Sequence, residues 1–238
     1  MIISARELDF KELNRQIRAA GDEVRIDDCY GQRFICSGLS TKTLTINGTP
    51  GNALGAYLDG GVITVNGNAQ DAVGDTMNDG KIIIHGNAGD ALGYAMRGGS
   101  IFVRANAGYR TGIHMKEYKD KKPVIIIGGS VGSFLGEYLA GGLIVVLGIG
   151  TNDVPVGNFT GTGMHGGKIF IRTNREVTGL PEQVTVEIAS DEDLRTIMPR
   201  ISEFAGYFDI EAETIVNHRF YLLKANTKNP YTQLYVKN

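Results

Sequence analysis

The sequence has 238 residues, of which 33 are glycine, two are cysteine and none is tryptophan, and its formal net charge is −2. This charge gives no electrostatic basis for binding nucleic acid or an anionic membrane, and two cysteines are too few for a disulfide framework. We find neither a signal peptide nor an apolar run near the roughly 18 residues of a membrane-spanning helix. We therefore expect a soluble, cytoplasmic and turn-rich protein.

The first predicted element is a short helix that begins after Asp9. Asp9 precedes Glu12 by three residues, which fits a capping box. Phe10, Leu13 and Ile17 then share one face, as the core side of an amphipathic helix requires. A short strand at residues 24–26 is expected to follow.

A repeat of nineteen residues organises the chain from Gly48 to Val103. Each unit has glycines at fixed positions and ends in four or five residues rich in Ile and Val, a pattern typical of strands between tight turns. A period near 20 residues indicates stacked units that bury their apolar faces against one another. We predict a mainly β fold, a single-stranded parallel β-helix. The glycines assigned to its repeat turns are Gly55, Gly74, Gly93, Gly112, Gly61, Gly80, Gly99, Gly142 and Gly167.

The spacing of the strand ends predicts about seven coils. The period is interrupted twice, by extra residues at 116–122 and at 149–156, and insertions in repeat arrays map to loops. The sequence does not indicate what these two loops do. The predicted strand ends are Ile46, Val65, Ile84, Val103, Ile127, Val146 and Ile171.

The remaining elements lie beyond the repeats. Residues 184–188 alternate as a strand, and Ser190 opens a helix in which we expect Pro199 to produce a kink or a split. The last thirty residues have no regular pattern, and they either pack along the stack or reach a neighbouring chain. We divide the chain into an N-terminal helix and cap (1–30), the β-helix (31–174) and a C-terminal strand and helix extension (175–238). A docking role for the first helix is the alternative to a cap.

The repeat also explains most residues that resemble functional motifs. Asn68, Asn87 and Asn106 recur at the period and are predicted to stack as a ladder, with a polar groove as the alternative. Residues 161–166 match a dinucleotide-binding fingerprint, but a strand follows them where the fingerprint requires a helix. The four histidines are scattered, the recurring methionines fit a core stack, and the acids form no consistent pair. We predict no catalytic, cofactor-binding or metal-binding residue.

The nineteen-residue units resemble a known repeat. Residues 67–84, with Gly67-Asn68-Ala69, Gly74, Met77 and Gly80-Lys81, are similar to the GXGXG repeat domain at the C-terminus of the glutamate synthase large subunit. Residues 138–148 and 157–167 resemble its later variants in the same order. The resemblance spans roughly residues 31–172. The C-type subunit of formylmethanofuran dehydrogenases resembles the same domain.

The resemblance implies a right-handed β-helix that joins catalytic domains and holds no catalytic residue itself. In glutamate synthases an amidotransferase hydrolyses glutamine, and ammonia with 2-oxoglutarate is reduced to glutamate on FMN beside an iron–sulfur cluster. No cysteine follows Met1 as an amidotransferase nucleophile, and two cysteines cannot supply a four-cysteine cluster. FMN and the cluster are therefore expected on partner subunits.

These observations lead to one hypothesis and two alternatives. The chain is expected to be a non-catalytic scaffold subunit that docks a glutamine amidotransferase subunit and an FMN-binding synthase subunit. The first alternative is a C-type subunit of a formylmethanofuran dehydrogenase-like complex. The second is a stand-alone β-helix enzyme with an active site in a groove. The docking face and self-association are left open by the sequence.

Overall fold

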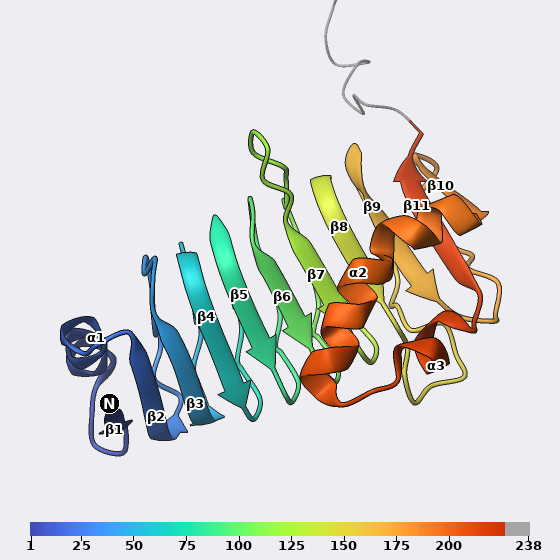
Figure 1. Ribbon diagram of the computed structural model, residues 1–238. Helices are drawn as coiled ribbons and strands as arrows, with labels where there is room; N and C mark the ends of the chain where they lie inside the picture. The colour runs from blue at the N-terminus through green and yellow to red at the C-terminus, as the bar shows by residue number, and fades with distance from the viewer. Residues whose placement is uncertain (227–238) are drawn as a thin grey trace, which may run out of the picture.

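A computed structural model describes residues 1–226 of the chain. Its parallel strands stack side by side into an elongated solenoid, with one strand in each coil (Figure 1). The sheet order is β1-β2-β3-β4-β5-β6-β7-β8-β9-β11-β10. The elements are β1 (Ile2–Ser4), α1 (Phe10–Ala19), β2 (Glu23–Tyr30), β3 (Thr43–Thr49), β4 (Asp59–Asn66), β5 (Asp79–Ile84), β6 (Ser100–Val103), β7 (Val124–Ile127), β8 (Ala140–Val146), β9 (Gly166–Arg172), β10 (Val184–Ile188), α2 (Asp191–Phe208), α3 (Ala212–Val216) and β11 (Phe220–Ala225).

The predicted strand ends form a continuous column. Ile46 pairs with Val65, Val65 with Ile84, and Ile84 with Val103, all in parallel register. The column also extends backwards, because Ile26 of β2 pairs with Ile46. The stack therefore has about eight coils rather than the predicted seven. The strand predicted at residues 24–26 belongs to this first coil, which was not counted because its spacing differs from nineteen residues.

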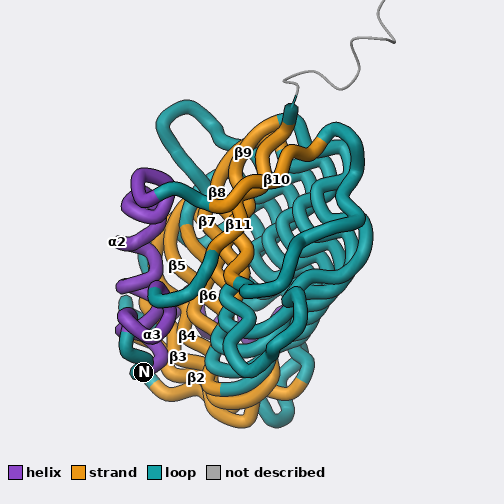
Figure 2. Tube along the Cα trace, turned by 90° about the vertical axis from the view of Figure 1, so that its right-hand side faces the viewer, coloured by secondary structure: helices purple, strands orange, loops and turns teal. Residues whose placement is uncertain are grey.

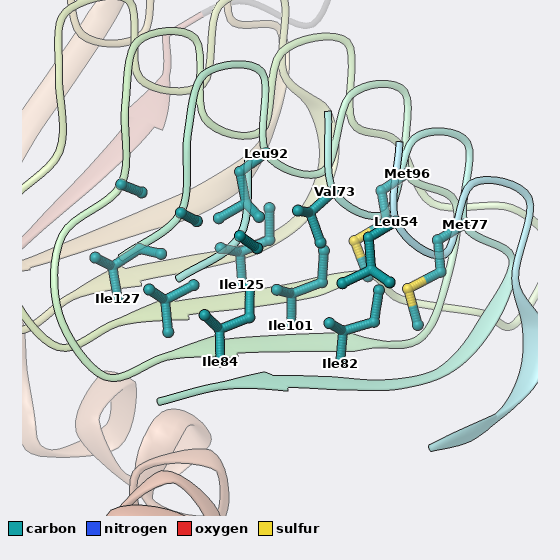
Figure 3. Close-up of a cluster of buried hydrophobic side chains, with 14 of the residues drawn as sticks. Leu54, Val73, Met77, Ile82, Ile84, Leu92, Met96, Ile101, Ile125 and Ile127 are labelled. Atoms are coloured by element: carbon teal, nitrogen blue, oxygen red, sulfur yellow. The ribbon is translucent and has the colours of Figure 1, made fainter. Parts of the chain in front are cut away.

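The core lies inside the coils. Two columns of inward-facing strand residues run along the stack, one through Ile82 of β5 and the other through Ile84. Both columns are buried. Leu54, Val73 and Leu92 point at them from the opposite side of the coil (Figure 3). Met77, Met96 and Met115 are also fully buried, which confirms that the recurring methionines belong to the core. Each coil thus completes its core only against its neighbours, as a stacked architecture requires.

The return arm of each coil has an unusual backbone. Alternate residues have positive φ, as at Ala53, Gly55 and Tyr57 with 62°, 65° and 56°. The middle one of these three positions is glycine in each repeat. In the next coil it is Gly74, where a Cβ would lie only 2.5 Å from Cδ1 of Ile101. The predicted turn glycines occupy this position (Gly55, Gly74, Gly93, Gly112) or the start of a strand (Gly61, Gly80, Gly99, Gly142, Gly167), all with φ between 65° and 97°.

Helix α1 lies at the N-terminal end of the stack (Figure 1). Its N-cap is Asp9, whose carboxylate accepts the backbone N–H groups of Lys11 and Glu12 at 2.9 and 2.8 Å. Glu12 pairs with Arg15 at 2.6 Å, so the reciprocal half of the predicted capping box is absent from this part of the described chain. Leu13 is fully buried, and the helix packs its apolar face against the first coil.

Helix α2 covers the outer face of the later strands, on the opposite side of the sheet from the return arms (Figure 2). Its apolar side, including Ile201 and Phe204, packs on outward-facing Phe102 of β6 and Phe170 of β9. A capping box at Ser190 begins the helix. The helix continues through Pro199, so of the two predicted outcomes, a kink or a split, the split does not occur. Proline removes one backbone donor, whereas the apolar side stays buried before and after it.

The C-terminal segments close the sheet. β11 pairs antiparallel with β9, and β10 pairs antiparallel with β11. Residues 220–225 are therefore a strand, whereas the sequence predicted irregular structure there. The predicted irregular stretch at Pro230 and Tyr231 lies outside the described residues.

Candidate functional site

The asparagine series forms a ladder between side chains and backbone. The Asn68 side-chain oxygen accepts the N–H of Asn87 at 2.8 Å, and the Asn87 oxygen accepts that of Asn106 at 3.1 Å. The Asn106 oxygen accepts the Ser130 N–H at 2.8 Å in the next coil. These amides therefore satisfy backbone donors where the chain turns, which is a structural role.

Two of the recurring acids form a second ladder that the sequence did not predict. The Asp71 carboxylate accepts the N–H of Asp90 at 2.9 Å, and the Asp90 carboxylate accepts the N–H of Tyr109 at 2.8 Å. Their nineteen-residue spacing was the available signal. Both carboxylates are used in stacking the coils, so they are not a pair poised for general acid and base catalysis.

The histidines do not come together. His85 packs edge-on against Phe208, with 5.2 Å between ring centroids, and His114 stacks on Tyr138 at 5.0 Å. His165 contacts the Gly163 carbonyl at 3.1 Å. Within residues 1–226 no group of three or more metal-ligating side chains is assembled.

The two cysteines are buried thiols in the first coils. Burial raises the pKa of Cys29 to about 11, and burial raises the pKa of fully buried Cys36 further. A thiol must ionise to act as a nucleophile or a metal ligand. Both cysteines are therefore suited to packing rather than to chemistry at neutral pH.

The segment that matches the dinucleotide fingerprint has no helix after it. Gly161 and Gly163 lie in a return arm, at φ of 75° and 69°, and residues 166–172 are strand β9. The arrangement that would direct a helix N-terminus at a pyrophosphate is therefore absent from this segment.

A groove runs along the edge of α2, where cationic side chains from several coils gather. Each of the central cations has a carboxylate partner: Lys81 and Arg200 bind Glu203 at 2.5 and 2.8 Å, and Lys121 binds Asp79 at 3.1 Å. Lys121 belongs to the insertion at 116–122, which thus folds back over earlier coils. Lys122 lines the groove as well, and the Lys81–Glu203 pair links β5 to α2, which favours a role in holding α2 on the sheet.

Glu203 is the centre of this network. Burial acts to raise the pKa of its carboxyl, but hydrogen bonds from Lys81, Arg200 and Tyr207 outweigh burial and lower it. The carboxylate therefore stays ionised in the folded protein at neutral pH.

A second hollow, with a volume of about 560 Å³, lies near the C-terminal end of the stack. It is lined by loop residues 148–152, by residues 172–174 and by His218. The Arg172 guanidinium donates to the Leu147 carbonyl at 2.8 Å and to the Ile215 carbonyl at 2.9 Å. Burial lowers the pKa of Arg172, and no carboxylate is among the lining residues. No spacing in the sequence indicates this hollow.

Aromatic side chains form an exposed row on the return arms of the later coils. Phe159, which is 55% exposed, stacks on Phe134 with 5.0 Å between centroids, and the Arg110 guanidinium lies 5.1 Å from the Phe134 ring. All three residues have positive φ, between 57° and 64°. Bulky side chains are rare in this conformation, but it recurs in the return arms of earlier coils, as at Tyr57 and Thr76, so it belongs to the coil geometry.

A second row of ring side chains, Tyr94, His114 and Tyr138, also lies on the return arms. Tyr94 packs edge-on against His114 at 5.9 Å, and His114 stacks on Tyr138. Tyr94 is 40% exposed. Together the two rows give the later coils an apolar and partly cationic surface of the kind enriched in protein interfaces.

The comparisons with known proteins agree with this architecture. The model of the GXGXG motif family matches residues 5–228. This chain belongs to the GXGXG motif family. It is 42% identical to the uncharacterized protein MJ1350 of Methanocaldococcus jannaschii over 250 residues, which cover 99% of this chain and 96% of that protein.

A solved structure has the same fold at lower identity. It is the formyltransferase/hydrolase complex of Methylorubrum extorquens bound to methylofuran, with a TM-score of 0.65 and 22% identity. The match covers 84% of this chain and 73% of that chain. This likeness shows the fold alone. Among the described helices, none is long and apolar enough to cross a membrane.

Proposed function

We propose that this chain is a non-catalytic scaffold subunit of a cytoplasmic glutamate synthase-like complex. It would dock a glutamine amidotransferase subunit and an FMN-binding synthase subunit, and FMN and an iron–sulfur cluster would reside on those partners. In this proposal ammonia released from glutamine aminates 2-oxoglutarate on the partners to give glutamate.

One observation chiefly supports the scaffold role. The repeat occupies most of the chain, and its polar residues at the repeat spacing bond the coils to one another. Asn68 and Asp71 bond to backbone groups of the next coil rather than to each other. Within residues 1–226 no group of three or more metal-ligating side chains is assembled, whereas exposed aromatic rows remain for partners to cover.

The synthase assignment is supported by the order of the repeat variants. Residues 67–84, 138–148 and 157–167 resemble successive parts of the glutamate synthase domain. A C-type subunit of a formylmethanofuran dehydrogenase-like complex is the second candidate, because the same fold occurs in the formyltransferase/hydrolase complex. Both candidates place the chain in a complex, and they differ in its partners.

Affinity purification from the source organism distinguishes the candidates. We expect the chromosomally tagged chain to co-purify with an amidotransferase and a flavin-containing subunit, with flavin absorbance in the eluate. An untagged strain is the control. Recovery of formyltransferase or molybdopterin-type subunits would support the second candidate. A purified chain that has no partner and turns over a substrate would contradict the scaffold role.

A point variant tests whether the aromatic rows contact a partner. Phe159→Ser removes an exposed ring and leaves the coil interior intact, so we expect partner recovery to fall several-fold while the chain stays folded. Tyr30→Ser is the matched control, because Tyr30 is 90% exposed but lies in β2, far from both rows. Equal loss with both variants would contradict docking at the aromatic rows.

A further inference from the structure

The hollow around Arg172 has the features of a binding site for a small oxyanion. Its volume of about 560 Å³ lies within the range of small-molecule sites. We propose that it binds the carboxylate or phosphate group of a small metabolite, with Arg172 as the principal ligand. This proposal concerns a ligand of the chain itself and does not depend on which complex the chain joins.

The guanidinium of Arg172 has unused donors. Arginine has five N–H groups, and two of those of Arg172 are used by the carbonyls of Leu147 and Ile215. No described carboxylate pairs with it. An arginine with a planar pair of N–H groups left over binds carboxylate and phosphate in two-point geometry. The two carbonyl bonds fix the plane of the group before any ligand arrives.

The neighbouring groups are also mainly donors. The Thr151 oxygen accepts the N–H of Asp153 at 3.1 Å, and the Thr173 oxygen accepts the N–H of Arg175 at 3.1 Å, so both hydroxyl hydrogens remain for another acceptor. Gly150 has φ of 88°, and a Cβ there would meet nothing within 4 Å. The loop therefore leaves open space around Gly150, one of the residues that line the hollow.

The groove along α2 differs from the Arg172 hollow in how its cations are paired. Along α2 the cations Lys81, Arg200 and Lys121 each bind a carboxylate of the same chain. In the hollow, by contrast, the half-buried Arg172 guanidinium has no carboxylate partner among residues 1–226. An incoming oxyanion would supply the missing charge in a partly desolvated site, where charge-assisted hydrogen bonds are strong.

The loop that forms the hollow is an insertion whose end, at Pro155 and Val156, pairs with Val131 of the previous coil. Residues 149–156 are the second interruption of the nineteen-residue period, and shorter turns serve the same purpose in earlier coils. Insertions in repeat proteins are often on the binding face. The insertion therefore adds the glycine loop that completes the hollow around Arg172.

Calorimetric titration of the purified chain with succinate and with inorganic phosphate tests the proposal. We expect one saturable site for at least one probe, and the preferred probe identifies the ligand class. Arg172→Gln should weaken binding by about tenfold or more, because a charged hydrogen-bond partner is lost. Arg25→Gln is the matched control, since Arg25 already pairs with Asp27 at 2.9 Å in β2, at the other end of the stack.

A second measurement uses the unaltered protein, because Arg172→Gln also removes two structural bonds. In NMR titrations with the same probes, we expect amide shifts confined to residues 148–152 and 172–174. Shifts scattered over the cationic surface, no saturable binding of either probe, or equal affinity in the Arg172→Gln variant would each overturn the proposal.

Discussion

The two halves of the solenoid differ on their outward face. In the first three coils the residue at the middle of each strand is polar: Arg25, Thr45 and Thr64. From β5 onwards the same column is apolar, and α2 covers it. The residues of this apolar column are Ile83, Phe102, Ile126, Val145 and Phe170.

This difference shows how the same inner core can support two kinds of surface. The inward columns are apolar in both halves, so the coils stack equally well along the chain. The outward column provides the apolar surface on which α2 packs, because an apolar column is stabilised when it is removed from water. We expect the later coils to be more stable and the earlier coils to open more readily.

The largest predicted effect comes from removing the main contact of α2. Phe204 is fully buried against the apolar column, so Phe204→Ala should lower the free energy of unfolding by about 3–5 kcal/mol. Thr64→Ala on the uncovered face should change it by less than about 0.5 kcal/mol. Urea denaturation followed by circular dichroism measures both. Similar losses in the two variants would show that α2 does not distinguish the halves.

Exchanging the outward residues sharpens the comparison. Ile83→Thr makes β5 resemble β4 and should cost about 2 kcal/mol, because Ile83 is only 3% exposed beneath α2. Thr64→Ile is the reciprocal change, and it should alter the free energy of unfolding by less than about 0.5 kcal/mol, since no helix covers that position. A large stabilisation by Thr64→Ile in urea denaturation would contradict this account.

The polar network around Glu203, at the edge of α2, contributes less to the free energy of unfolding than the apolar contacts of the helix do. Glu203→Gln should cost about 1 kcal/mol, because the 19% exposed carboxylate loses charge-assisted bonds that solvent partly screens. Since folding lowers the pKa of Glu203, its contribution is full above the unfolded pKa of about 4.3 and is lost as the pH falls through the folded value. The difference in urea midpoint between the two proteins should therefore disappear in acid. A difference that persists at pH 2 would exclude this ionisation.

Thiol labelling tests the order in which the halves open. Cys29 and Cys36 lie in the early coils, and burial raises the pKa of both, so they should react only when those coils open. A variant with both cysteines changed to alanine and Val145→Cys places the thiol beneath α2. We expect the native thiols to label at lower urea concentration than the introduced one. Simultaneous labelling would indicate that the solenoid opens as one unit.

The period predicts most of the solenoid because each rung repeats the same contacts. Strand positions, the inner columns and the Asp9 cap follow from local pattern. The strand at residues 24–26 was predicted but not counted as a coil, because Ile26 and Ile46 are twenty rather than nineteen residues apart. The positive φ of Phe134 and Phe159 was missed, because residue type disfavours a conformation that the stacked coil imposes.

The covering helix and the hollow depend on tertiary placement. The change from Thr64 to Ile83 in the outward column was a local signal that α2 would pack there, although periodicity alone does not say which segment covers it. The hollow unites residues near Gly150, Arg172 and His218, and no spacing rule joins these segments. The predicted absence of catalytic residues stays a prediction.

Omitting the chain from a reconstituted complex tests the scaffold role most directly. The account predicts that the partner subunits still make glutamate from added ammonia but no longer from glutamine, because nothing then holds the amidotransferase to the synthase. Adding the purified chain back should restore the glutamine-dependent reaction. Undiminished glutamine-dependent synthesis without the chain would contradict the account.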